Sequence, residues 1–394
     1  MFRHLFKLIW NKRKQNILFL SEILVSFLVI FSISSMLVYY YLNYRKPTGF
    51  EYEKVWAIYY SNPLKTKDKD TLATFFGQVR STLSALPQIK EVSFTGSNFP
   101  YANSNSTSGF TYQGKKYNRI NYFQVDQNYD KALSAKMVEG RWFNKEDGIM
   151  KSNLIVINAT LKENMFGTQP AVGKLIGDDE DKNKSKIVGV IEDIKTGGDY
   201  YPAGPGMYKM LDSASYEWIS VILIKVTDNA DAVFESSLSK LMAKSIPNSN
   251  IGISHLTNLR ESKNADTVIP VVICSTIAGF LIINVALGLF GVLWYNINQR
   301  RGEIGLRRAI GASGSSVASQ LVTESLFLAT LSLILGSFFA IQFPLLNVFD
   351  LPSAVYLIAL LLSVLFIYIL VILCSLYPGR QAAAIHPAIA LHEE

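Results

Sequence analysis

The chain has 394 residues, of which 49% are hydrophobic, and its mean hydropathy is positive. This composition leaves room for two domains but excludes a chain packed wholly in a water-soluble core, because much of the apolar surface must be buried in lipid. The net charge of +7 does not indicate nucleic-acid binding, since ten of the 38 basic residues lie in segments predicted below to be cytoplasmic and the outer segment holds 28 basic against 25 acidic residues.

Four stretches are long and apolar enough to cross a bilayer as helices, and no other part of the sequence qualifies. Each carries at most one charged residue. The first stretch is too long for a signal-peptide core and has no small-residue cleavage site after it, so we interpret it as an uncleaved signal anchor. The predicted spans are residues 17–42, 268–295, 319–343 and 353–377.

The distribution of basic residues orients these spans, because cytoplasmic segments are enriched in Lys and Arg. Residues 1–16 hold five basic residues and are predicted to form a cytoplasmic amphipathic helix, over residues 2–10, that lies at the membrane surface. The segment between the third and fourth spans contains no Lys or Arg and is placed outside. Both termini are therefore predicted to be cytoplasmic, with residues 43–267 outside and residues 296–318 and 378–394 inside.

The outer segment begins and ends with the same order of strand, helix and strand. Alternating apolar residues predict a strand at 54–60, Asp70 is placed to cap a helix that starts at Thr71, and a strand follows at 89–95. The order returns at residues 220–226, 230–246 and 251–255. We therefore expect an α+β domain with a membrane-proximal subdomain (43–95 and 216–257), an inserted distal subdomain (96–215) and a helical stalk (258–267).

The outer segment carries no recognisable catalytic constellation. His255 is its only histidine, and no nucleophile or metal-ligand cluster accompanies it in the sequence. Residues 167–174 contain two glycines and a lysine but fail as a phosphate-binding loop, because five residues separate the glycines and Leu175 stands where Ser or Thr is needed. A membrane-tethered enzyme is therefore the weakest functional class, and we expect this chain to bind no cofactor or metal itself.

The spans contain polar and small residues that predict contacts between helices. Glu22 and Glu324 each lie about one turn inside a span, and we expect each to pair with a basic group. For Glu324 we expect that group to come from the basic loop before the third span. Small residues at four-residue spacing let helices approach closely, although in the second span a lipid-facing role has equal weight. The predicted packing positions are Ser275 and Gly279 in the second span and Ser332, Gly336 and Ala340 in the third.

The basic loop between the second and third spans is the most informative stretch. Its apolar residues recur at near-helical spacing, Arg307 follows Glu303 by four residues and Gly311 is placed to end the turn, which predicts a short helix beneath the membrane. Charge alone leaves two explanations open, a topological anchor or a docking surface for a cytosolic partner. The predicted docking residues are Arg301, Glu303, Ile304, Gly305, Leu306, Arg307, Arg308, Ala309, Ile310, Gly311 and Ala312.

The residue order of this loop favours docking. It resembles the Arg-x-Glu-Ile-Gly-hydrophobic-Arg-Arg-Ala-hydrophobic-Gly-Ala-Ser run of the MacB/FtsX-like ABC transporter permease family. The tail at residues 377–391 is similar to the tail of that family, although Gly379 and Gln381 replace the usual Ala and Arg. The outer segment resembles the MacB-type core domain in its series Gly140-Arg141-Trp142-Phe143, Phe166-Gly167, Pro170-Ala171-Val172-Gly173-Lys174 and Val188-Gly189-Val190.

The resemblance implies a four-span permease of the bacterial inner membrane that dimerises with a second copy or a paralogue and docks two cytosolic ATPase subunits at the loop. ATP and Mg²⁺ would bind to those partners, because this sequence contains no Walker A or Walker B motif. ATP hydrolysis would move the outer domain to export or extract a peptide, lipoprotein or amphiphilic drug, with a periplasmic adaptor or substrate protein as a further partner. The alternative is a regulator of a periplasmic cell-wall hydrolase.

Overall fold

The computed structural model describes residues 13–61, 68–147, 153–177, 184–211, 215–246 and 248–385. These residues form two compact units. The membrane unit comprises the residues up to Leu42 and those from Val268 onward, and the outer unit comprises Asn43–Thr267. The amphipathic helix predicted at residues 2–10 and the last part of the predicted tail lie outside the described residues.

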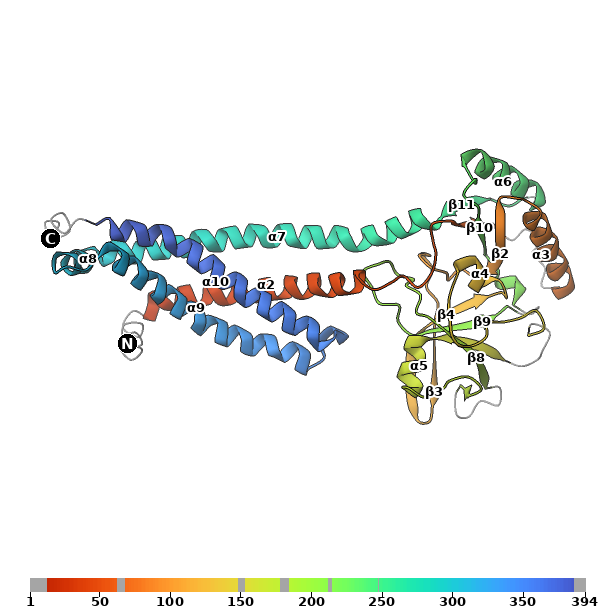
Figure 1. The fold of residues 1–394 in the computed structure, drawn as a ribbon, viewed down its shortest axis with the longest axis horizontal. Coiled ribbons are helices and arrows are strands. Elements are labelled where there is room, and N and C mark those ends of the chain that lie inside the picture. Colours follow the sequence, from red (N-terminus) through yellow and green to blue (C-terminus); the bar gives the residue numbers. More distant parts are fainter. Residues whose placement is uncertain are drawn as a thin grey trace. The chain divides into compact units, whose positions relative to one another are not determined.

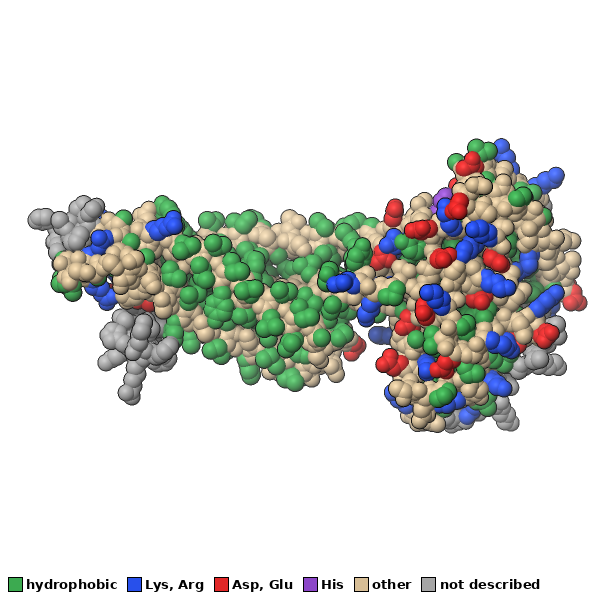
Figure 2. All heavy atoms as spheres, in the orientation of Figure 1, with side chains coloured by type: hydrophobic (Ala, Val, Ile, Leu, Met, Phe, Trp, Pro, Cys, Tyr) green, Lys and Arg blue, Asp and Glu red, His purple; other side chains and the backbone are tan. Residues whose placement is uncertain are grey.

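Among the described residues, four helices are long and apolar enough to cross a membrane, which confirms the predicted fold class together with the mixed α/β outer unit (Figure 1). Hydrophobic side chains cover the visible face of the membrane unit, whereas charged side chains are spread over the outer unit (Figure 2). The four helices are α2 (Arg13–Tyr44), α7 (Leu256–Gln299), α9 (Gly314–Leu345) and α10 (Ser353–Ala383), with the shorter α8 (Arg301–Ala309) and η2 (Val348–Asp350) between them.

Small residues of α9 allow close packing against α2. The hydroxyl of Ser332 donates a hydrogen bond to the backbone carbonyl of Leu20 at 3.0 Å, and a Cβ atom on Gly336 would lie only 2.5 Å from the Phe27 ring. Ala340, one turn further along α9, is also buried. In α7 a Cβ atom on Gly279 would meet no described atom within 4 Å, so the packing position predicted there has no partner within the described chain.

Glu22 of α2 differs from the expectation of a basic partner. Within the described residues it forms no ion pair, and its carboxylate lies against α7 instead. A Cβ atom on Gly288 would be 1.9 Å from the Oε1 atom of Glu22. The missing side chain of Gly288 therefore makes the room that this carboxylate occupies.

In the outer unit the two strand–helix–strand segments interleave in one sheet. The strand order is β11-β1-β10-β2, and β10 lies between β1 and β2, antiparallel to both. Asp68, and not Asp70, caps the first helix of this sheet, because the helix begins two residues earlier than expected. The elements are β1 (Val55–Tyr59), α3 (Lys69–Ser84), β2 (Ile89–Thr95), β10 (Val221–Val226), α6 (Ala232–Ser245) and β11 (Gly252–His255).

The central strands β1 and β10 are buried on both faces, because successive side chains of a strand point to opposite sides of the sheet. One face packs against α3 and α6, and the other face packs against the inserted residues. The two strands therefore belong to two hydrophobic cores at once. Trp56, Ile58, Ile222 and Ile224 enter the first core, and Val55, Ala57, Val221 and Leu223 enter the second.

The inserted residues extend the sheet to eleven described strands in the order β11-β1-β10-β2-β4-β9-β6-β8-β5, with β3 on β4 and β7 on β8. Thr95 pairs with Val125 where β2 meets β4, and backbone hydrogen bonds from Gly96 to Gln124 and from Asp126 to Phe94 flank this pair. That residues 43–95 and 216–257 lie nearer the membrane than residues 96–215 stays a prediction. The elements are β3 (Thr107–Tyr112), β4 (Lys115–Val125), α4 (Tyr129–Leu133), β5 (Met137–Gly140), β6 (Leu154–Asn158), α5 (Ala159–Phe166), β7 (Leu175–Ile176), β8 (Ser185–Ile191), β9 (Gly206–Met210) and η1 (Tyr216–Trp218).

Candidate functional site

The basic loop folds as the short helix α8, which a tight turn joins to α9. α8 spans Arg301–Ala309, and Gly311 follows it with a φ of +102°, a conformation that favours glycine after a helix. The next helix, α9, begins at once, with the hydroxyl of Ser313 accepting a hydrogen bond from the backbone N–H of Ser316 at 3.2 Å. Gly311 and Ser313 therefore end α8 and start α9 within a few residues of each other.

One face of α8 is part of a small hydrophobic core. Ile304 is 5% exposed and packs with Ile297 of α7, Val317 of α9 and Ala382 of α10. The adjacent Gly305 is buried as well. The side chain of Ile304 therefore holds α8 to three helices of its own chain and does not lie on an outward face.

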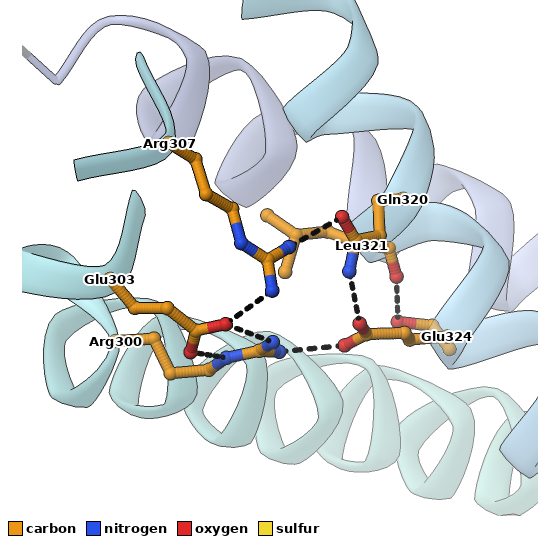
Figure 3. Close-up of polar contacts among 7 residues, drawn as sticks. Arg300, Glu303, Arg307, Gln320, Leu321 and Glu324 are labelled. Carbon is orange, nitrogen blue, oxygen red and sulfur yellow. Dashed lines mark hydrogen bonds and ion pairs between the residues drawn. The ribbon is translucent and has the colours of Figure 1, made fainter. Parts of the chain in front are cut away.

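A network of charged and amide side chains joins α8 to α9 (Figure 3). The guanidinium of Arg300 donates to Glu303 at 3.1 Å and to Glu324 at 2.7 Å, which confirms that Glu324 pairs with the basic loop. Arg307 donates to Glu303 at 2.5 Å and to Gln320 at 2.8 Å, and Gln320 donates in turn to Glu324 at 2.9 Å. Every group in this network has a partner of opposite charge or complementary hydrogen-bonding type.

Burial alone would lower the pKa of Arg300, because a charged group is costly to remove from water. The carboxylates of Glu303 and Glu324 outweigh that effect, and the pKa of Arg300 is raised above its usual value. The guanidinium therefore stays charged while it crosslinks the start of α8 to α9.

Arg308 ties the other end of α8 to α10. Its guanidinium donates a hydrogen bond to the backbone carbonyl of Ala383, the last residue of α10. A Cβ atom on Gly314 would lie 3.0 Å from the same carbonyl oxygen, so the start of α9 comes close to this point too. Arg300 and Arg307 thus attach α8 to α9, and Arg308 attaches it to α10.

The opposite face of α8 is open. Leu306 is 54% exposed and Ile310 is 79% exposed, and their four-residue spacing places both on one side of the helix. Arg301, Ala309 and Gly311 are exposed beside them, and Ala312 is half-buried. An exposed apolar pair rimmed by polar residues is typical of a protein-binding surface. We call the exposed residues Arg301, Leu306, Ala309 and Ile310 the α8 outer face.

The structure thus divides the predicted docking residues into two groups. Glu303, Ile304, Arg307 and Arg308 make contacts within the chain, whereas the side chains of Leu306, Ala309 and Ile310 are exposed. The sequence contained this signal, since Ile304 and Arg308 are one turn apart on one side and Leu306 and Ile310 are one turn apart on another. Sequence reasoning missed Arg300 and Gln320, whose contacts depend on the fold of α9 back onto α8.

His255, the histidine of the outer unit, lies in the edge strand β11. His255 stacks on Trp56 with the ring centroids 4.5 Å apart, and its Nε2 atom lies 3.0 Å from a carboxylate oxygen of Glu235. Within the residues that the structure describes, no group of three or more potential metal ligands is found. His255 therefore serves packing at the sheet edge.

Two family models match consecutive parts of the chain. The MacB-like periplasmic core domain matches residues 26–239, and the FtsX-like permease C-terminal domain matches residues 275–387. The second match includes α8 and the network around it.

The chain is similar to curated MacB proteins and to solved outer domains. It is 25% identical over 308 residues to the macrolide export ATP-binding/permease protein MacB of Bdellovibrio bacteriovorus, which covers 73% of this chain and 46% of that protein. It is 22% identical over 240 residues to MacB of Aggregatibacter actinomycetemcomitans, covering 59% of this chain and 36% of that protein. The chain thus spans about half the length, or less, of the curated relatives it matches.

Among solved structures, the periplasmic region of MacB from Actinobacillus actinomycetemcomitans matches with 17% identity and a TM-score of 0.37, over 53% of this chain and 92% of that one. The extracellular domain of the ABC-type transporter YknZ from Gram-positive bacteria matches with 12% identity and a TM-score of 0.35, over 50% of this chain and 99% of that one. With a MacB-like core domain model over more than half of its length and an FtsX-like permease model over its last three helices, the chain belongs to the MacB-like family of ABC transporter permeases.

Proposed function

We propose that this chain is a non-catalytic inner-membrane subunit that couples ATP hydrolysis by a separate ATPase to motion of its outer unit, for the export or extraction of a peptide, lipoprotein or amphiphilic drug. The observation that carries the proposal is the α8 outer face, an exposed apolar surface on a helix that is crosslinked to the membrane helices. In this proposal α8 and both termini lie in the cytoplasm and residues 43–267 lie outside.

A separate ATPase is the proposed source of energy. The curated relatives are named ATP-binding/permease proteins. The sequence of this chain contains no Walker A or Walker B motif, so we assign ATP and Mg²⁺ to a partner subunit. Two such subunits are expected if the permease pairs with a second copy or a paralogue.

The α8 outer face fits a groove on that partner. Leu306 and Ile310 supply apolar anchors, and such buried anchors carry most of the binding energy at protein interfaces. Arg301 at the rim offers a cation that favours association with acidic groups. The contacts of Arg300, Arg307 and Arg308 hold the helix rigid, which reduces the entropy lost on docking.

Two continuous helices support transmission of motion toward the outer unit. α2 and α7 each extend past the boundary between the two units, and α7 extends from Leu256 to Gln299 with Pro270 inside it. Because α8 follows α7 after one residue, a displacement of α8 would move the end of α7 at Gln299. The match to the MacB-like core domain favours a transporter over a regulator of a cell-wall hydrolase.

The test places a charge on the α8 outer face. We expect Ile310→Asp, and more strongly Leu306→Asp with Ile310→Asp, to remove the ATPase subunit from permease purified out of native membranes, because a buried carboxylate without a partner is costly. Val233→Asp is the matched control, since Val233 is 76% exposed on α6 of the outer unit. Retention of the ATPase by the double variant would contradict docking at this face.

Replacing Arg307 and Arg308 by Glu is a second possible test of docking, but it is less selective. Both side chains bond within the chain, to Gln320 and to the carbonyl of Ala383, so Glu at these positions would loosen α8 as well as alter its charge. The substitutions at Leu306 and Ile310 leave those contacts in place. They therefore separate loss of docking from loss of the helix.

A further inference from the structure

The segment that follows β8 contacts both helices that enter the outer unit. We call residues 194–200 the clasp. Its first residue, Ile194, is buried in the second hydrophobic core, which fixes the clasp to the sheet. All of the contacts described below lie within Asn43–Thr267 and therefore within one compact unit.

Lys195 of the clasp holds the end of α2. Its side chain is buried, and its ammonium donates hydrogen bonds to the backbone carbonyls of Asn43 at 2.5 Å, Lys46 at 2.7 Å and Asp199 at 3.0 Å. Asn43 lies in the last turn of α2, where carbonyls have no partner within the helix and a cation is favoured by the helix dipole. All three ammonium protons are thereby used, two of them on the end of α2 and the residues just after it.

Asp199 of the clasp holds the start of α7. Its carboxylate accepts two hydrogen bonds from the guanidinium of Arg260, at 3.1 and 2.6 Å, and one from the amide of Asn264 at 2.7 Å. The backbone N–H of Asp199 donates to the carbonyl oxygen of the Asn264 side chain at 2.9 Å. Paired charge-assisted bonds of this kind fix both distance and orientation.

The shape of the clasp matches these contacts. Gly198 has a φ of +104°, and a Cβ atom there would lie 3.0 Å from the Asn264 side chain, so a glycine is needed for this close approach. At the other helix, the ring of Tyr200 stacks on that of Tyr44 at 5.5 Å between centroids. Besides the bonds of Lys195 and Asp199, the clasp therefore contacts α7 through Gly198 and α2 through Tyr200.

We propose that the clasp joins the end of α2 and the first three turns of α7 into one mechanical element, so that a displacement of either helix is passed to the other and, through β8, to the outer sheet. Lys195 and Asp199 are positioning residues in this proposal. The use of this joint in transport rests on the proposed function, but the joint itself operates without nucleotide or partner. Seven hydrogen bonds form this joint, and they involve the buried side chains of Lys195 and Asp199 and the backbone N–H of Asp199.

Hydrogen exchange of the full-length permease in nanodiscs, without ATP or ATPase, tests the joint. Asp199→Asn weakens the bonds to α7 and leaves the carbonyl acceptors of Lys195 in place, yet we expect exchange to rise about tenfold or more at residues 43–48 as well as at 256–267. Lys195→Met weakens the bonds to α2, and we expect exchange at 256–267 to rise in turn. A purely local role would change only the helix whose own bonds are lost, and that result would overturn the proposal.

Asp147→Asn is the matched control. Asp147 is a nearly buried carboxylate that accepts two hydrogen bonds from Arg141, at 2.5 and 2.9 Å, but contacts neither helix. It should leave exchange at 43–48 and 256–267 unchanged. Should Asp199→Asn raise exchange throughout the outer sheet, Arg260→Lys, which keeps the charge and loses the paired bond, gives the same comparison in a folded chain. If the Leu306→Asp and Ile310→Asp double variant kept its ATPase while Asp199→Asn and Lys195→Met gave the expected exchange pattern, the result would count against the proposed function only.

Discussion

Asp199 and Glu303 each accept hydrogen bonds from arginine, but the side chain of Asp199 is 4% exposed and that of Glu303 is 42% exposed. In the outer unit, the carboxylates that pair with Arg80, Arg141 and Arg260 are 7%, 2% and 4% exposed, and each accepts several hydrogen bonds. Around α8 the pairs are partly open to solvent, and an apolar face lies beside them. A buried pair that loses one member leaves an uncompensated charge, whereas an exposed pair is worth little. The outer pairs therefore fix geometry, and the α8 pairs orient a helix that remains available to a partner.

The largest effect that this comparison predicts is at Asp126, a buried carboxylate of the outer unit. It accepts hydrogen bonds from Arg80 at 2.5 Å, from Ser93 at 2.7 Å and from the backbone N–H groups of Phe94 and Asn128 at 2.9 and 3.1 Å. We expect Asp126→Ala to lower the free energy of unfolding of the outer unit by about 3 kcal/mol or more, because Arg80 and two backbone groups lose their partner. Denaturant titration followed by tryptophan fluorescence measures this change.

The control for this prediction is an exposed pair of the same type. Asp228 pairs with Lys54 at 3.2 Å, and both side chains are largely exposed. Asp228→Ala should change the free energy of unfolding by less than about 0.5 kcal/mol. Equal effects of the two substitutions would remove the distinction between enclosed and open pairs.

A smaller effect is expected on the two faces of α8, which offer a matched pair of isoleucines. Ile304→Ala should lower the local stability of residues 301–309 by about 2 kcal/mol, on the order of a thirtyfold rise in hydrogen exchange, because it empties part of a packed cluster. Ile310→Ala should change that exchange by less than about twofold, since its side chain is largely in solvent. The same Ile310→Ala should nevertheless weaken ATPase binding about tenfold.

The opposite pattern would reverse the assignment of the two faces. If Ile304→Ala left exchange unchanged and Ile310→Ala raised it, the packed side of α8 would be the one that carries Ile310. If neither substitution altered ATPase binding while Leu306→Ala did, the anchor would be confined to one residue. Measuring exchange and binding on the same preparations separates these outcomes.

Much of this architecture could be predicted from the sequence, because its signals are local. Hydropathy predicted the third span at 319–343, within α9, and alternation predicted the strand at 54–60 that contains β1. The cap of α3 was assigned to the wrong aspartate, since Asp68 and Asp70 both precede the helical pattern and only the actual start selects one. Short-range patterns thus locate elements but not their ends.

The contacts that position the two candidate sites could not be predicted in this way. Lys195 meets Asn43 across 152 positions of the chain, and Arg300 meets Glu324 only because α9 folds back on α8. The interleaving of β10 between β1 and β2 is equally non-local, because β10 lies more than 120 residues after both strands. Such contacts follow from the fold as a whole and leave no pattern within a short window.

The smallest predicted effect concerns acid, and it distinguishes two aspartates within the outer unit. Hydrogen bonds from Arg141 lower the pKa of Asp147 below its usual value of 3.8, so its stabilising contribution is present above that value and is lost as the pH falls through the lowered pKa. Burial raises the pKa of Asp130, whose Oδ1 atom has no hydrogen-bond partner among the described residues, so its destabilising contribution is relieved as the pH falls through the raised pKa. The two groups therefore respond to acid with opposite signs.

Asn substitutions make these opposite signs measurable. Asp147→Asn should reduce the free energy of unfolding at pH 7, and the difference from the unmodified chain should shrink below about pH 4 as Asp147 itself becomes protonated. Asp130→Asn should increase the free energy of unfolding at pH 7, and that gain should disappear already at a higher pH, because Asp130 takes up its proton earlier. Both effects should be modest, since the Arg141 side chain is 49% exposed and solvent screens its charge. If the free energy of unfolding changed with pH in the same way for both variants, burial of a carboxylate would govern stability in this unit, whatever hydrogen bonds it accepts. The difference drawn above between carboxylates with many donors and those without would then be wrong.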